Sequence, residues 1–198
     1  ATFWSESSPA GVDYYLVSGP SMDGVIANYR RLTGPAPMLP KAAFGLFMSK
    51  ERYRTKDELV GAVRRFRDDG FPLDYIVQDW QYWGGGSRDL LDVGVDALWM
   101  EGTEVEVGSA CHDPNRVEAD IKSLGFNHLG DYTRYLNVYS LVTTQGTYEG
   151  QRACGDKRVL TLTRSAWNGQ QRYAALSWSG DTTASWETLR NQIAGGVY

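Results

Sequence analysis

Residues 44–79 carry a strand pattern, a helix pattern and a second strand pattern in succession. The two apolar strand segments are residues 44–48 and 74–79. Between them, Thr55 and Glu58 have the spacing of a capping box at a helix N-terminus, with Leu59, Val63 and Phe66 on one face of the helix and Gly70 and Pro72 ending it. Because consecutive parallel strands need such a crossover, this unit predicts a parallel sheet in an α/β fold.

The rest of the chain continues this alternation. Apolar strand patterns recur at residues 95–100, 159–163 and 173–178. Residues 105–135 show no clear period and are predicted to form a loop with a short helix. A last helix is expected after Ser185, with an apolar inner face and an end at Gly195–Gly196; the inner face would hold Trp186, Leu189 and Ile193.

The N-terminal part has a different texture. Residues 12–17 are predicted to form a strand, and residues 22–32 have helical apolar spacing that ends at Gly34. Three prolines, at positions 35, 37 and 40, then form a stiff connector. We therefore expect a boundary that separates residues 1–34 from residues 35–198.

Composition excludes several classes of function. The net charge is −4 and no long basic run occurs, which argues against nucleic acid as a partner. No apolar run approaches the roughly 20 residues of a membrane helix, and no signal peptide pattern opens the chain. Cys111 and Cys154 are free thiols or one bridge. Two histidines and no Cys-x-x-Cys make a zinc site improbable, and no cofactor is predicted.

Charged residues stand where the predicted strands end. In parallel α/β folds the carboxyl ends of strands collect functional side chains, and Asp79, Glu101, Arg164 and Asp181 all fall there. A lone carboxylate at a strand end is more often a helix cap or a salt-bridge partner. Four charged groups at one end of successive strands favour a site, and two facing carboxylates can cleave a glycosidic bond.

Aromatic residues surround two of these carboxylates. The chain has seven Trp and twelve Tyr, which serve either as core or as flat walls for a ligand such as a sugar. Trp99 precedes Glu101, and Trp178 precedes Asp181. A phosphate enzyme has little support, because Gly84–Gly86 lacks the lysine and helix of a phosphate-binding loop.

Several long motifs resemble glycoside hydrolase family 31, in particular its bacterial α-xylosidase-like branch. They recur in family order and cover most of residues 12–198. The motifs are residues 29–41, 44–53, 71–83, 94–104, 137–139, 148–152, 157–165, 169–173 and 178–181.

The resemblance implies an eight-stranded (β/α) barrel, (β/α)8, of the TIM-barrel type, preceded by a β-sandwich whose end would lie in residues 1–34. It places Glu101 at the position of the nucleophilic aspartate and Asp181 at that of the general acid/base. Arg164 and Asp79 match substrate-binding residues, and Trp178 matches an aromatic wall, to which we add Trp99 as a candidate. No metal is implied.

The implied activity is that of a retaining α-glycosidase that removes terminal α-xylosyl or α-glucosyl residues from an α-linked oligosaccharide or xyloside. Five strands cannot close an eight-stranded barrel, and the joint at residues 84–87 stands where the family has a longer segment. We therefore expect a shortened, open barrel whose edges favour self-association. The alternative is a catalytically impaired relative or engineered fragment that binds sugar or serves a structural role.

Overall fold

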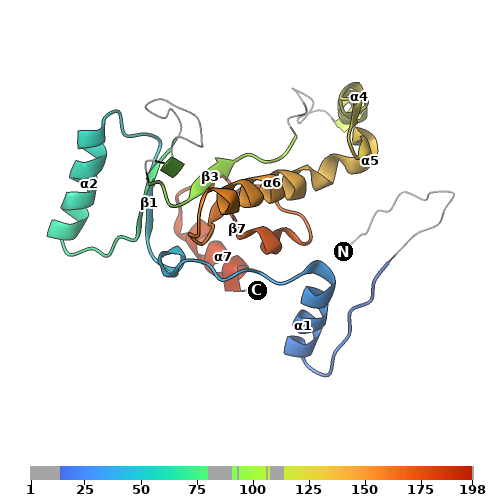
Figure 1. Ribbon diagram of the computed structural model, residues 1–198, viewed down its shortest axis with the longest axis horizontal. Helices are drawn as coiled ribbons and strands as arrows, with labels where there is room; N and C mark the ends of the chain where they lie inside the picture. Colours follow the sequence, from blue (N-terminus) through green and yellow to red (C-terminus); the bar gives the residue numbers. More distant parts are fainter. Residues whose placement is uncertain (1–13, 80–90, 93, 106, 108–113, 198) are drawn as a thin grey trace. The chain divides into compact units, whose positions relative to one another are not determined.

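The computed structural model describes residues 14–79, 91–92, 94–105, 107 and 114–197 (Figure 1). The chain divides into two compact units, Ala1–Pro35 and Ala36–Tyr198. The joint predicted at residues 84–87 and Cys111 lie outside the described residues. The origin of residues 1–34 in a β-sandwich stays a prediction.

In the first unit, helix α1 spans Met22–Thr33 and confirms the predicted helix. Ser21 caps it by accepting a hydrogen bond from the Gly24 amide at 3.2 Å, and Gly34 ends it with a φ of 92°. The strand predicted at 12–17 is wrong for its described part, because residues 14–17 form no strand. Tyr14, Tyr15 and Leu16 are exposed, and an extended segment becomes a strand only when another strand pairs with it.

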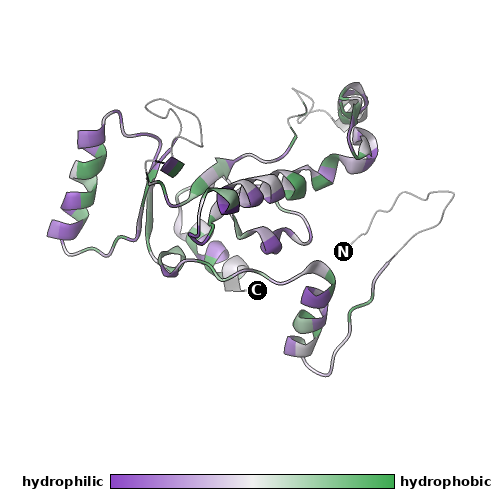
Figure 2. Cartoon of the chain, in the orientation of Figure 1, coloured by the Kyte–Doolittle hydropathy of each residue, from purple (hydrophilic) through white to green (hydrophobic). Residues whose placement is uncertain are grey.

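In the second unit, the predicted strand–helix–strand unit is confirmed. Strands β1 (Phe47–Lys50) and β2 (Tyr75–Gln78) pair in parallel, and helix α2 (Lys56–Asp68) connects them. The helix carries charged and apolar residues along its length (Figure 2). Thr55 accepts from the Glu58 amide at 3.2 Å, as the capping box requires. The first strand begins later than predicted because Lys41–Phe44 forms a 3₁₀ turn, η1.

A second parallel sheet contains the other three predicted strands. Its members are β3 (Leu98–Glu101), β6 (Thr161–Thr163) and β7 (Ala175–Ser177), in the order β3-β6-β7. The last strand begins two residues later than predicted, because Gln170–Tyr173 forms the 3₁₀ turn η4. Within the described residues no strand ladder joins this sheet to β1 and β2, so the part of the barrel seen here is open.

Between β3 and β6 the chain is more regular than its sequence predicts. It forms α4 (Pro114–Ser123), an antiparallel hairpin of β4 (Phe126–Asn127) and β5 (Gly130–Asp131), a helical turn α5 (Tyr132–Tyr135) and the 3₁₀ turn η3 (Leu136–Val138). The short helix predicted within residues 105–135 is therefore present, whereas the hairpin was not predicted. The 16-residue helix α6 (Tyr139–Cys154) follows and ends in the exposed free cysteine Cys154.

The last helix, α7, spans Trp186–Val197, and Ser185 caps it by accepting from the Thr188 amide at 3.1 Å. Its predicted inner face is wrong. Trp186, Leu189 and Ile193 are 87%, 51% and 61% exposed. Helical spacing shows that a helix has an apolar side but does not show what covers it. The helix also continues through Gly195 and Gly196, which were expected to end it.

Leu160→Ala is expected to lower the free energy of unfolding by about 2–5 kcal/mol, because it empties a fully buried leucine site. Leu160 precedes β6 and is 1% exposed. Urea unfolding of the purified variant measures the change. Leu189→Ala is the matched control on the exposed side of α7, with an expected change within about 0.5 kcal/mol. Equal losses in the two variants would contradict this account of the core.

Candidate active site

Three of the predicted site residues lie at the same edge of the β3-β6-β7 sheet. Glu101 is the last residue of β3, Arg164 follows β6 directly, and Asp181 comes four residues after β7. Because the strands are parallel neighbours, their carboxyl ends meet. The Arg164 amide donates to the Glu101 carbonyl oxygen at 2.9 Å, and the Trp178 amide donates to the Thr163 carbonyl oxygen at 2.9 Å. These two hydrogen bonds thus join the ends of β3 and β7 to the end of β6.

Asp79 lies at the end of the other parallel sheet, which β1 and β2 form. It directly follows β2 and is partly buried. The end of β2 is held by Gln78, whose side-chain amide donates to the Tyr53 carbonyl oxygen at 3.2 Å. Asp79 is therefore also at the carboxyl end of a parallel strand, as predicted.

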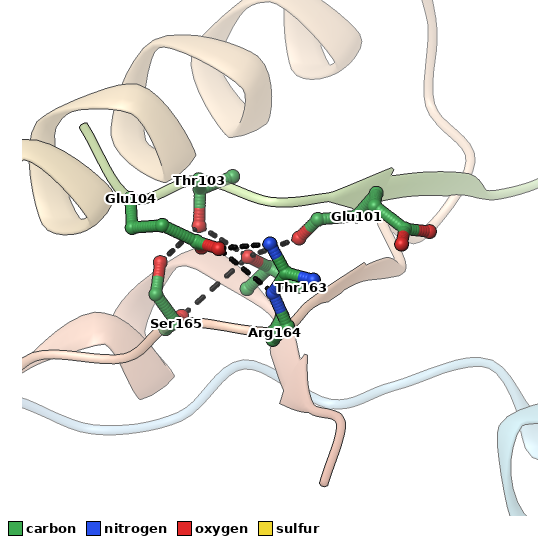
Figure 3. Close-up of polar contacts among 6 residues, drawn as sticks. All are labelled: Glu101, Thr103, Glu104, Thr163, Arg164 and Ser165. Carbon is green, nitrogen blue, oxygen red and sulfur yellow. Dashed lines mark hydrogen bonds and ion pairs between the residues drawn. The ribbon is translucent and has the colours of Figure 1, made fainter. Parts of the chain in front are cut away.

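Glu101 has an unusual backbone conformation. Its φ is 56°, in the left-handed region, and the ladder between β3 and β6 is irregular between Trp99 and Glu101. Non-glycine residues adopt this conformation rarely, and it costs on the order of 1–3 kcal/mol. The Glu101 side chain is exposed and points away from the Glu104–Arg164 pair (Figure 3). Such outliers concentrate at functional sites, where the surrounding structure maintains them.

Arg164 forms an ion pair with Glu104, which was not among the predicted site residues. Its Nε donates to Glu104 Oε1 at 2.7 Å, and its Nη2 donates to the same oxygen (Figure 3). This hydrogen bond and the charge of Glu104 raise the pKa of Arg164, with smaller contributions from Glu101 and Asp181. The guanidinium group therefore lies within the field of all three carboxylates. The sequence feature that could have indicated this role is a second glutamate three residues after Glu101.

The ionised form of Glu104 is favoured in this arrangement. Burial alone would raise the pKa of Glu104, but hydrogen bonds from Arg164 and the backbone, the Arg164 charge and a contact with Ser165 outweigh burial. The net pKa of Glu104 is therefore below its ordinary value. The carboxylate and the guanidinium group are both charged at neutral pH.

A cluster of hydroxyl groups lies beside this ion pair (Figure 3). Thr103 Oγ1 forms hydrogen bonds with Thr163 Oγ1 and, at 2.7 Å, with Ser165 Oγ. Thr163 Oγ1 also donates to the Glu101 carbonyl oxygen at 3.3 Å. Thr103 and Thr163 are buried, so these contacts exclude water and fix the segment after β3 against the segment after β6.

Trp99 and Trp178, both predicted site residues, form an aromatic pair. The rings of Trp99 and Trp178 are 5.3 Å apart in an edge-to-face arrangement, with an interplanar angle of 69°. Trp99 lies on β3, and Trp178 follows β7, on the two sides of β6. The aromatic surroundings expected for Glu101 and Asp181 thus form one cluster at the edge of the sheet.

A pocket of about 290 Å³ adjoins the ion pair. The segments after β3 and β6 and the start of α6 line it, with Glu104, Asn137, Tyr139 and Trp167 among its side chains. Neither Glu101 nor Asp181 lines it. The pocket is therefore a neighbour of the predicted carboxylates and does not contain them.

Among the described residues, no group of three or more His, Cys, Asp and Glu side chains is placed to hold a metal ion. The helices in the same part of the chain are all too short or too polar to cross a membrane.

Comparison with known proteins identifies the family. The model for the family 31 TIM-barrel domain of glycosyl hydrolases matches residues 36–91 and 83–198. The chain belongs to glycoside hydrolase family 31. The predicted resemblance is confirmed, and with it the TIM-barrel class of the domain.

Among relatives, an α-xylosidase of Saccharolobus solfataricus is 34% identical over 274 residues, covering 98% of this chain and 36% of the relative. Among solved structures, the family 31 α-xylosidase from Xanthomonas citri has 30% identity and a TM-score of 0.71, covering 91% of this chain and 29% of that one. A family 31 α-xylosidase from a soil metagenome, solved with xylose, has a TM-score of 0.62 at 24% identity, over 85% of this chain and 36% of its own. The chain thus spans about a third of their length.

The two matched segments overlap at residues 83–91, where the glycine joint at 84–87 lies. The alignment with the Saccharolobus enzyme runs over 274 residues, more than the 198 of this chain. Some residues of that relative therefore have no counterpart here.

Proposed function

We propose that this chain is a shortened catalytic barrel of a retaining α-glycosidase that acts on terminal α-xylosyl or α-glucosyl residues. The observation that carries the proposal is the order β3-β6-β7, which brings Glu101, Arg164 and Asp181 to one sheet edge. Family membership supports the reaction class, and the names of relatives such as the Saccharolobus α-xylosidase support the sugar.

In the proposed reaction, Glu101 and Asp181 divide the chemistry between them. The Glu101 carboxylate attacks the anomeric carbon while the glycosidic C–O bond breaks and Asp181 gives its proton to the leaving oxygen. Asp181, now ionised, then takes a proton from water, and that water attacks the same carbon and releases Glu101. Arg164 and Asp79 would hold hydroxyl groups of the sugar, and Trp178 and Trp99 would pack against its C–H face.

The shortening itself is part of the proposal. We infer that a segment of the family barrel is absent at residues 83–91, since the family model matches in two separate segments that overlap there. An open sheet leaves unpaired edges, and exposed apolar residues such as Trp186 would favour association of chains. Self-association stays a prediction.

A second candidate function is sugar binding without turnover. The observation that favours it is Glu101, which replaces the aspartate implied by the family resemblance and has a left-handed φ of 56°. A longer side chain on a strained backbone displaces the carboxylate from the position that attack requires.

Release of p-nitrophenol from p-nitrophenyl α-xyloside and α-glucoside by the purified chain separates the two candidates. The proposed enzyme releases p-nitrophenol from at least one substrate at a rate proportional to protein concentration. Saturable xylose binding without release would support the second candidate instead. The absence of both xylose binding and p-nitrophenol release would contradict both candidates.

A further inference from the structure

Glu104 holds Arg164 in a single orientation. Two nitrogens of the guanidinium group, Nε and Nη2, donate to the same oxygen, Glu104 Oε1. A planar guanidinium group bound through two nitrogens cannot rotate freely about its last bonds. The direction of the remaining nitrogen, Nη1, is therefore set by Glu104.

Two glycines lie beside Arg164, and Gly102 leaves the room that its guanidinium group occupies. A Cβ atom on Gly102 would lie 3.0 Å from Arg164 Nη2 and 3.2 Å from Glu104 Oε1, closer than side chains normally approach. Gly180 has a φ of 78°, and a Cβ atom there would lie 3.6 Å from Arg164 Cδ. Arg164 thus lies against the segment after β3 and the segment that leads to Asp181.

The backbone segment that carries Glu104 is held in place by buried hydrogen bonds. Glu104 follows Thr103, which is 3% exposed and bonded to the hydroxyls of Thr163 and Ser165. The carboxylate therefore projects from a fixed segment, although its own side chain is 40% exposed. A fixed support and a two-nitrogen contact together orient the arginine.

The third nitrogen is available to a ligand. Within the described part of the chain Nη1 of Arg164 has no hydrogen-bond partner, and Figure 3 shows the unbonded nitrogen on the side of Glu101. A hydrogen-bond donor in that position faces the sheet edge at which β3 ends in Glu101 and β7 leads to Asp181.

We propose that Glu104 is a positioning residue that aims Arg164 Nη1 at a hydroxyl group of the sugar bound at the Glu101–Asp181 edge. This inference rests on the proposed function for its substrate. The ligand class is a neutral xylosyl or glucosyl unit, because Glu104 already balances the arginine charge.

Glu104→Gln tests the proposal, with Glu58→Gln as the matched control. Glu58 also accepts from a basic side chain, Lys50 Nζ at 2.7 Å, and its side chain is 39% exposed. We expect Glu104→Gln to raise KM for p-nitrophenyl α-xyloside about tenfold, the order of one charge-assisted hydrogen bond, with a smaller change in kcat. Its Tm should change no more than that of Glu58→Gln.

A double variant shows whether Glu104 acts through Arg164. On an Arg164→Lys background, Glu104→Gln should add less than about twofold to KM, because the oriented group is already gone. The full tenfold effect on that background would overturn the proposal.

Nuclear magnetic resonance keeps the test independent of activity. The Nε–H resonance of Arg164, assigned by its absence in Arg164→Lys, should shift in Glu104→Gln and stay in place in Glu58→Gln. An unchanged resonance in Glu104→Gln would overturn the proposal even if the chain hydrolyses xylosides. A shifted resonance in a chain without hydrolysis would support the positioning role while the proposed function failed.

Discussion

Glu101→Asp is expected to increase the rate of p-nitrophenyl α-xyloside hydrolysis about a hundredfold. The family resemblance places an aspartate at this position, and the extra methylene of glutamate moves the carboxylate by about 1 Å. A displacement of that size costs on the order of a hundredfold in rate. Aspartate also adopts the left-handed conformation found at Glu101, with its φ of 56°, more readily than glutamate does.

Initial rates at saturating substrate measure this effect. Glu101→Gln is the control, since it keeps the length of the side chain and removes the charge needed for attack, and it should be slower than the unmodified chain. If Glu101→Asp were slower as well, the carboxylate of Glu101 would already be well placed, and the explanation by displacement would be wrong.

Asp181→Asn is expected to lower kcat/KM by about 10²–10⁴-fold, the usual contribution of general acid–base catalysis. The loss should be larger for an alkyl or sugar leaving group than for p-nitrophenolate, which departs with little help from a proton. Measuring both substrate types gives the ratio.

Asp156→Asn provides the control for this loss, because Asp156 is an exposed aspartate in the turn after α6. It should leave both rates unchanged. Equal losses for both leaving groups in Asp181→Asn would assign Asp181 a role other than proton donation.

Local signals in the sequence predicted much of the fold. Thr55 and Ser185 cap the helices that they were expected to cap, and the five parallel strands lie near their predicted positions. These features depend on a few neighbouring residues. The helix α6 was not predicted, because its buried residues are Ser140 and Thr144 and so give no apolar period.

Features that depend on distant contacts were harder to predict. Whether a side of α7 is buried depends on the elements that pack against it. The spacing of Trp186, Leu189 and Ile193 in the sequence does not show where those elements lie. The sequence also placed Arg164 at a strand end but did not reveal its partner. Glu104 and Arg164 are 60 residues apart, and only the pairing of β3 with β6 brings them together.

The assignment of Glu101 as the nucleophile is the central claim, and covalent trapping tests it most directly. The chain would be incubated with 5-fluoro-α-xylosyl fluoride, whose glycosyl–enzyme intermediate hydrolyses slowly, and the labelled peptide would be fragmented in a mass spectrometer. One added fluoroxylosyl group on Glu101 is the expected result. A label on Glu104 or on any other residue, or no label in a chain that binds xylose, would contradict it.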